Sequence, residues 1–271
     1  MTDTQKLIKY VAIALAICLI ITIFSGIAGA LGIFTLIFDG NGTSDEMTEY
    51  TVEITPANLF LEINAANIII KQGDSFKIES NLKHLKVEED ADDNALSVKE
   101  KSKFNYHSTD ADLVLYIPKD HSFSTVEILG GAGKLSISEL NTSNLQLTLG
   151  AGNFEADKLC IQNNCSIEGG VGKISIYDGT INNLDLEMGV GDLCITSSFY
   201  GICELDMGIG SSDLNLYKTD EGYRFNISKG IGSITLDGVA VPSGENSFGE
   251  GTTRINVSGG IGKISINTKG E

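Results

Sequence analysis

The residues whose types and spacing resemble a chemical site are glycine-rich loops followed by lysine. The segment GGVGKISIYDG covers residues 169–179, and near-copies, GGAGKLSI and GGIGKISI, begin at Gly130 and Gly259. Loops of this kind bind nucleotide phosphates, calcium or dinucleotides in other proteins. A structural explanation competes with all three, because glycine is also the residue that a sharp backbone corner requires.

Spacing excludes the three ligand-binding interpretations. A Walker loop requires G-x-x-x-x-G-K-[ST], but Gly133 and Lys134 are followed by Leu135. The calcium motif G-G-x-G-x-D requires aspartate where the three copies have Leu135, Ile174 and Ile264, which cannot ligate calcium. A dinucleotide fingerprint needs a helix after the glycines, whereas a strand-like pattern follows here. We therefore expect no cofactor.

The glycine pairs recur with a short period, which is typical of stacked structural units. Successive first glycines are separated by 19, 20, 19, 19, 22 and 30 residues. We expect both glycines of each pair to form a corner of the backbone. The predicted corner glycines are Gly131, Gly133, Gly150, Gly152, Gly170, Gly172, Gly189, Gly191, Gly208, Gly210, Gly230, Gly232, Gly260 and Gly262.

Apolar and polar residues alternate strictly on both sides of each glycine pair. Five and three residues before it, every repeat has an apolar residue or cysteine, as at Leu147, Leu186 and Leu205. The alternation resumes four residues after it, where only Ser212 interrupts the apolar column, and we expect a local bulge there. The residue between the glycines is always apolar, and we expect it to point inward. A period of two is typical of a strand with one buried face.

These patterns predict an all-β fold, a parallel β-solenoid with coils of about 19–20 residues, preceded by one N-terminal transmembrane helix. Each coil should stack on the preceding one at about 4.8 Å. The asparagine pairs at 163–164 and 182–183 suit the opposite corner. Residues 50–271 form the predicted solenoid domain, with irregular coils over 50–125 and regular G-x-G repeats over 126–271.

Several segments outside the regular repeats carry their own predictions. Residues 237–253 are expected to form a protruding loop that folds over the open end as a cap. In the irregular part we predict strands over residues 52–54, 59–70 and 113–118 and an acidic-tipped hairpin over residues 85–99.

A long apolar segment precedes the solenoid. Residues 11–38 are 28 consecutive uncharged residues, and about 20 suffice to span a membrane. A cleavable signal peptide is the alternative, because the AGA at residues 28–30 resembles a cleavage site. The apolar run continues beyond that point, which favours an uncleaved anchor in the membrane.

The flanking charges orient this anchor. Lys6 and Lys9 precede it, whereas the stretch after it is acidic. Because positive charge stays on the cytoplasmic side, we expect a single-pass protein of the cell membrane. Residues 1–10 would be a short cytoplasmic N-terminus, residues 39–49 a flexible tether, and the bulk of the chain extracytoplasmic.

Acidic residues dominate the remainder of the chain. The total charge is −17, and residues 1–38 contribute +1, which leaves −18 for residues 39–271. Nucleic acid is therefore excluded as a partner, because phosphate contacts need clustered basic residues. Five carboxylates should project outward from successive coils, and we call them the acidic ladder: Glu168, Glu187 and Asp206 in one column, and Asp185 and Glu204 in the next.

Like charges about 5 Å apart repel one another, and a divalent cation would relieve that repulsion. The acidic ladder is accordingly a candidate metal site or an adhesive patch. The alternative is an acidic face that serves solubility.

Histidine and cysteine indicate no catalytic site. His84, His107 and His121 have no serine, cysteine or metal-ligand set around them, and we expect them at the surface. Cys165 and Cys203 fall on core positions, and too few cysteines remain for a disulfide framework. We identify no catalytic residue.

The region over residues 50–271 resembles a bacterial "putative adhesin" family of envelope β-strand-repeat domains of unknown function. The resemblance is carried by the strand that ends at Ile117 and Pro118, by the repeated glycine-pair units, and by the final GENSFGEGTTRINVSGGIGKISI. It implies an envelope location and the repeat fold, with no active site. The family's Ser-Gly-Asp corner is absent here, since aspartate follows the corner only at Asp192.

Three functions remain open from the sequence. The first is a non-enzymatic surface module for adhesion or scaffolding, with a protein or cell-surface partner or self-association through its faces and ends. The second is an envelope-stress sensor whose ectodomain signals through the helix. The third is a polysaccharide hydrolase or lyase with carboxylates on its outer face.

Overall fold

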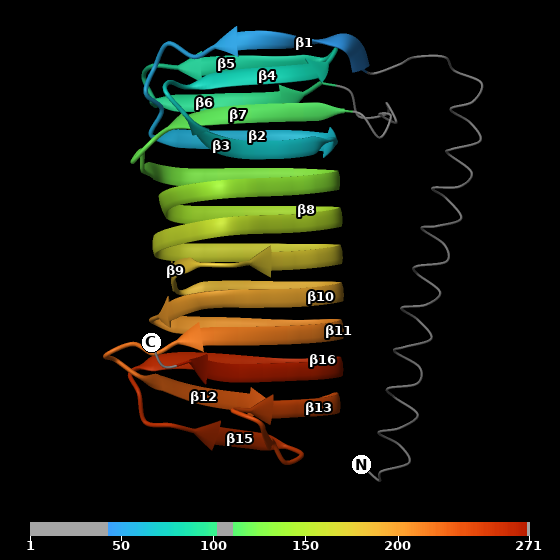
Figure 1. Ribbon diagram of the computed structural model, residues 1–271, viewed down its shortest axis with the longest axis vertical. Coiled ribbons are helices and arrows are strands. Elements are labelled where there is room, and N and C mark those ends of the chain that lie inside the picture. The colour runs from blue at the N-terminus through green and yellow to red at the C-terminus, as the bar shows by residue number, and fades with distance from the viewer. Residues whose placement is uncertain (1–42, 102–110, 270–271) are drawn as a thin grey trace, which may run out of the picture. The chain divides into compact units, whose positions relative to one another are not determined.

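The computed structural model describes residues 43–101 and 111–269, and these form one 16-stranded sheet that winds into coils (Figure 1). No helix in these ranges is long and apolar enough to cross a membrane. The predicted anchor at residues 11–38 lies outside the described residues. The strands are β1 (Thr43–Thr51), β2 (Asn58–Ala65), β3 (Asn67–Gly73), β4 (Lys77–Leu82), β5 (Leu85–Asp90), β6 (Ala95–Glu100), β7 (Asp112–Pro118), β8 (Phe123–Ile176), β9 (Gly179–Asn182), β10 (Leu184–Tyr200), β11 (Ile202–Tyr217), β12 (Tyr223–Ser228), β13 (Ile231–Leu236), β14 (Val239–Ala240), β15 (Glu245–Phe248) and β16 (Thr253–Lys269).

Parallel pairing between coils confirms the all-β repeat fold. Strand β10 pairs in parallel with β8 on one side and with β11 on the other. The register places Leu186 between Ile167 and Leu205, and all three side chains are buried. Period-two alternation therefore produces continuous apolar columns inside the coils, because in-register stacking repeats each inward position at every turn.

The last two coils do not stack in the order of the sequence. Strand β16 lies between β11 and the pair β12 and β13, so the final coil is inserted between the two coils that precede it in the sequence (Figure 1). The expectation that each coil stacks on the one before it is wrong here. The 30-residue gap before Gly260 gives the chain enough length to pass around the outer coil and return inside it.

The first coils show the same departure at the other end. Strands β2 and β3 pair with β8 on one side, while β6 and β7 pair with them on the other. The strands predicted over 59–70 and 113–118 are therefore present as β2, β3 and β7. The predicted hairpin is also confirmed, since β5 and β6 are antiparallel.

Two expectations near the N-terminal end are corrected. Residues 43–49, expected within a flexible tether, form part of β1, which pairs antiparallel with β4 and covers its edge. Residues 52–54, expected as a strand, are not one. The amides of Glu53 and Ile54 both donate to Oε2 of Glu89, at 2.9 Å each, so a side chain replaces the strand partner.

Antiparallel segments cover both ends of the stack. At the C-terminal end, β15 pairs with β12 and β14 pairs with β13, so the segment expected as a capping loop folds over that end as two short strands. Lys229 fixes this cap, because its Nζ donates to the carbonyl oxygen of Val241 at 3.3 Å. Short or charged outer strands protect a sheet edge against pairing with another chain.

Candidate binding surface

The glycine corners are built by direct contact between the backbones of neighbouring coils. A Cβ placed on Gly172 would lie 1.6 Å from the carbonyl oxygen of Gly152, and one on Gly152 would lie 1.8 Å from that of Gly133. The second glycine of every pair also has a positive φ, for example +146° at Gly172. Glycine satisfies both requirements, because it has no Cβ and adopts a positive φ without strain.

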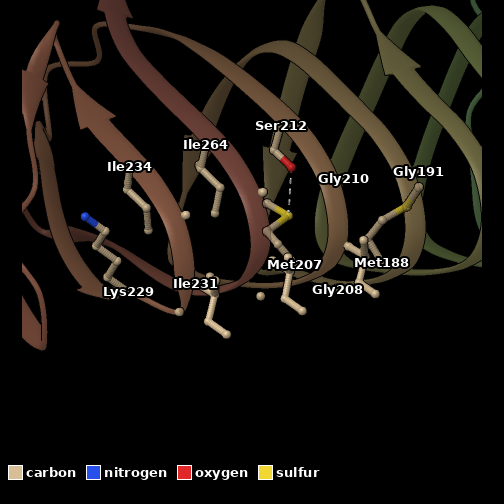
Figure 2. A pocket seen from close by; sticks show the side chains of 17 residues that line it. Met188, Gly191, Met207, Gly208, Gly210, Ser212, Lys229, Ile231, Ile234 and Ile264 are labelled. Atoms are coloured by element: carbon tan, nitrogen blue, oxygen red, sulfur yellow. Dashed lines mark hydrogen bonds between the residues drawn. The ribbon is translucent and has the colours of Figure 1, made fainter. Parts of the chain in front are cut away.

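The apolar residue between the two glycines points outward, which corrects the expectation that it points inward. Val171 is 52% exposed and Ile231 is 42% exposed, and Figure 2 shows the Ile231 side chain directed away from the coils. On the inner side of the corner, the side chains of Ile174 and Met188 occupy the space beneath Gly169, where a Cβ would lie 2.8 Å and 3.0 Å from them. We call this column the apolar ridge, and in spatial order it consists of Ala132, Ala151, Val171, Val190, Ile209, Ile261 and Ile231.

The apolar ridge is the surface feature that reasoning from alternation misses. Each corner shifts the period-two phase by one residue, and the sequence pattern alone does not say on which side of the middle residue the shift falls. The residue between the two glycines is apolar in all seven repeats. That recurrence is the signal in the sequence that could have identified an exposed apolar column.

The space inside the corner is filled in two coils by a methionine side chain, because the residue between the glycines points outward. Met188 and Met207 are buried, and they line a small cavity of about 20 Å³ together with Ser212 (Figure 2). Ser212 pairs in register with Leu193 and Ile264 without any register shift, so the predicted bulge is absent. Its hydroxyl instead donates to the Met207 sulfur at 3.4 Å, which accounts for a polar residue in an apolar column.

The acidic ladder has the register that the repeat predicts. Glu187 pairs with Glu168 on one side and Asp206 on the other, and Asp185 pairs with Glu204. All five side chains are exposed. The first column borders a groove of about 580 Å³ whose floor is corner glycine backbone. In the part of the chain that the structure describes, no group of three or more His, Cys, Asp or Glu residues is placed to hold a metal ion. Cation binding by the ladder stays a prediction.

The strand after the corner carries the opposite charge next to the apolar ridge. Lys173 and Lys263 are exposed three residues after the first glycine of their coils. Lys134 occupies the same column, and its Nζ lies 2.6 Å from Oε2 of Glu155. Hydrogen bonds from Lys134 and from the Tyr177 hydroxyl lower the pKa of Glu155. The ridge is therefore bordered by the carboxylates of the acidic ladder on one side and, in three of its seven coils, by a lysine on the other.

Two histidines have different surroundings. His84 is exposed, as expected. His121 is half-buried against the rings of Phe76 and Phe123, with centroids 4.8 Å and 4.4 Å away, which corrects its assignment to the surface. Burial lowers the pKa of His121. His107 lies outside the described residues.

Two cysteines lie in the core, as the alternation predicts. Cys165 and Cys203 are buried, with Leu184 between them in one apolar column. Burial raises the pKa of the Cys203 thiol to about 11 and raises that of Cys165 further. These groups act as small apolar core residues, because a thiol with so high a pKa yields almost no reactive thiolate near neutral pH.

The coil stack, its glycine corners and its polar faces together define a repeat domain of coiled β-strands. The Toastrack DUF4097 family model matches residues 57–247, and the chain belongs to this family. The assignment agrees with the resemblance inferred from the glycine-pair units.

Several solved structures are similar to this chain at low identity. A putative cell adhesion protein from Clostridium sporogenes is 17% identical with a TM-score of 0.38, covering 83% of this chain and 99% of that one. A putative adhesin from Bacteroides fragilis is 15% identical with a TM-score of 0.47, covering 84% and 100%. A putative adhesin from Parabacteroides distasonis is 13% identical with a TM-score of 0.34, covering 85% and 100%. No curated protein matches the chain.

Proposed function

We propose that the chain is a membrane-anchored, extracytoplasmic binding or scaffold module without enzymatic activity, similar in role to a surface adhesin. The anchor is the apolar segment at residues 11–38, oriented by Lys6 and Lys9. The related structures from Clostridium, Bacteroides and Parabacteroides, which carry adhesion-related names, support the same class of function.

The observation that carries this proposal is the register of the outward columns. Each outward residue has an equivalent neighbour one strand away, as in the series from Glu168 through Glu187 to Asp206. A surface that repeats at about 4.8 Å can bind an extended partner at many equivalent points, so that weak contacts add together.

Location is tested first, on intact cells that produce the full chain. An epitope tag at the C-terminus should be removed by added protease in intact cells, and one at the N-terminus only after lysis. The protein should also remain in the membrane pellet after alkaline carbonate extraction. A chain released by carbonate, or a C-terminal tag that resists protease, would contradict the proposed anchor or its orientation.

Binding is tested on the same cells with a surface variant. Replacing Asp185 and Glu204 by asparagine removes two exposed charges without altering a buried residue. Attachment of these cells to a panel of cell-surface glycans and matrix proteins should fall relative to cells that carry the unaltered chain. If deleting the chain alters envelope-stress transcription while attachment to the whole panel is unchanged, the sensor function replaces the adhesive one.

A further inference from the structure

We propose that two copies of this chain associate side by side along the apolar ridge, in parallel, with the twofold axis along the coil stack. The ridge is an unpartnered column of seven apolar residues, one from each glycine-pair coil. Six steps of about 4.8 Å make it about 29 Å long. Its distal half is β-branched, and Val171 and Ile231 are among the most exposed large apolar residues described.

Charge next to the ridge distinguishes the two possible orientations of a second copy of the chain. A twofold axis along the stack places the carboxylate side of one copy against the lysine side of the other, at equal height. Glu168 and Lys173 belong to the same coil, so each copy's Glu168 faces its partner's Lys173. An antiparallel pair would instead place the column of Glu168, Glu187 and Asp206 against itself, and like charges so close repel.

One residue in the lysine column has the opposite charge. Asp192 stands there, at the height of Glu187, so these two carboxylates would face one another in the parallel pair; the Asp192 carboxylate accepts a hydrogen bond from Ser211 in the next coil. The remaining charged members, Lys134, Lys173 and Lys263, are basic. The parallel pair therefore has one attractive and one repulsive contact at each seam, whereas the antiparallel pair would bring three carboxylates of each copy together, which favours parallel over antiparallel association.

The length of the ridge indicates a weak interface that a shared membrane would strengthen. A strip about 29 Å long and one side chain wide is small compared with the roughly 800 Å² per partner of a standard interface. Two copies anchored in one membrane meet at a high effective concentration, which compensates for low intrinsic affinity. This strengthening rests on the proposed anchor, whereas the charge argument does not. If both anchors enter one membrane from the N-terminal ends of the two stacks, those ends must point the same way, which also requires the parallel orientation.

Disulfide trapping in membranes that contain the full chain distinguishes the orientations. Val171→Cys and Ile231→Cys lie near opposite ends of the exposed β-branched part, about 19 Å apart along the stack. In a parallel pair each ridge residue faces the same residue of the other copy, so each cysteine variant alone should form a disulfide-linked dimer on mild oxidation. Gln162→Cys, exposed beside the opposite corner, is the matched control. The background carries Cys18→Ser, Cys160→Ser and Cys194→Ser.

We expect at least tenfold more linked dimer for each ridge variant than for Gln162→Cys. Yields equal to that control would overturn the association. Linkage only when Val171→Cys and Ile231→Cys are co-produced would overturn the parallel orientation. Carbonate extraction of the same membranes tests the anchor separately. A chain released by carbonate contradicts the proposed anchor, whereas an anchored chain without cross-linking contradicts the association.

A charge exchange tests the predicted contact between Glu168 and Lys173. In the Val171→Cys background, Glu168→Lys should lower the dimer yield several-fold, because two lysines then meet at that height. Adding Lys173→Glu should restore the yield, since the pair is re-formed with its charges exchanged. A double variant that remains as low as the single one would contradict the facing pair.

Discussion

The substitution Gly172→Ala isolates the contact on which every coil of the stack depends. The added Cβ would lie 1.6 Å from the carbonyl oxygen of Gly152 and 2.7 Å from its carbonyl carbon. Contacts of a Cβ below 3.0 Å are essentially never observed, so the backbones must separate by about 1.4 Å, the difference between 3.0 and 1.6 Å. No side-chain rotation can relieve this contact, because both groups belong to the main chain.

Two costs add in this variant. Alanine at a φ of +146° is strained by about 1–3 kcal/mol. Separation of the coils weakens about two backbone hydrogen bonds near the corner, each worth about 1 kcal/mol. The total of about 3–5 kcal/mol corresponds to a Tm lower by about 6–20 °C for a domain of this size.

Gly238→Ala provides the matched control. Gly238 also has a positive φ, +79°, but nothing lies within 4 Å of the Cβ that alanine would add. This variant should cost only the backbone strain, about 1–2 kcal/mol. The Tm of each variant is measured on the full chain in detergent, with circular dichroism as the signal during thermal melting. Equal Tm values for the two variants would refute the claim that coil contact, rather than φ alone, requires glycine at the corner.

Three further predictions concern the core and the titrating groups. Leu186→Ala should lower the free energy of unfolding by about 2–5 kcal/mol in a denaturant titration, whereas Glu187→Ala at the neighbouring exposed position should change it by less than about 0.5 kcal/mol. Burial lowers the pKa of His121 in the folded state, so the unfolded state binds more protons and stability should fall as the pH drops below about 6.5. Melting curves between pH 5 and 8 should show this loss in the natural chain and a reduced loss in His121→Gln; identical slopes would contradict it. Cys165 and Cys203 should resist a maleimide at pH 7 in the folded chain and react after denaturation, as mass spectrometry would show.

The regular coils could be predicted from the sequence because each residue there has a single local role. Leu186 and Glu187 are adjacent, yet one is buried and the other exposed, as period-two alternation requires. The glycine pairs fix the corners for an equally local reason. The acidic ladder followed from the same repeat, since equal spacing from a corner places residues in one column.

The departures arise where the outcome depends on distant parts of the chain. Strand β1 has no apolar alternation because it lies at an edge, and it exists through its pairing with β4. His121 is half-buried because Phe76 and Phe123 approach it from elsewhere in the sequence. The outward direction of Val171 is a separate case, because it follows from the backbone turn at the corner and not from the alternation of the strands.

The position of β16 has a consequence for how the protein is made. Its ladder partners are β11 on one side and β12 with β13 on the other, so residues 223–236 cannot reach their native neighbour until residues 253–269 have left the ribosome. Assembly at this end therefore waits for β16. Shortening the chain before Thr253 would therefore expose two open strand edges at once, that of β11 and that of β12 with β13.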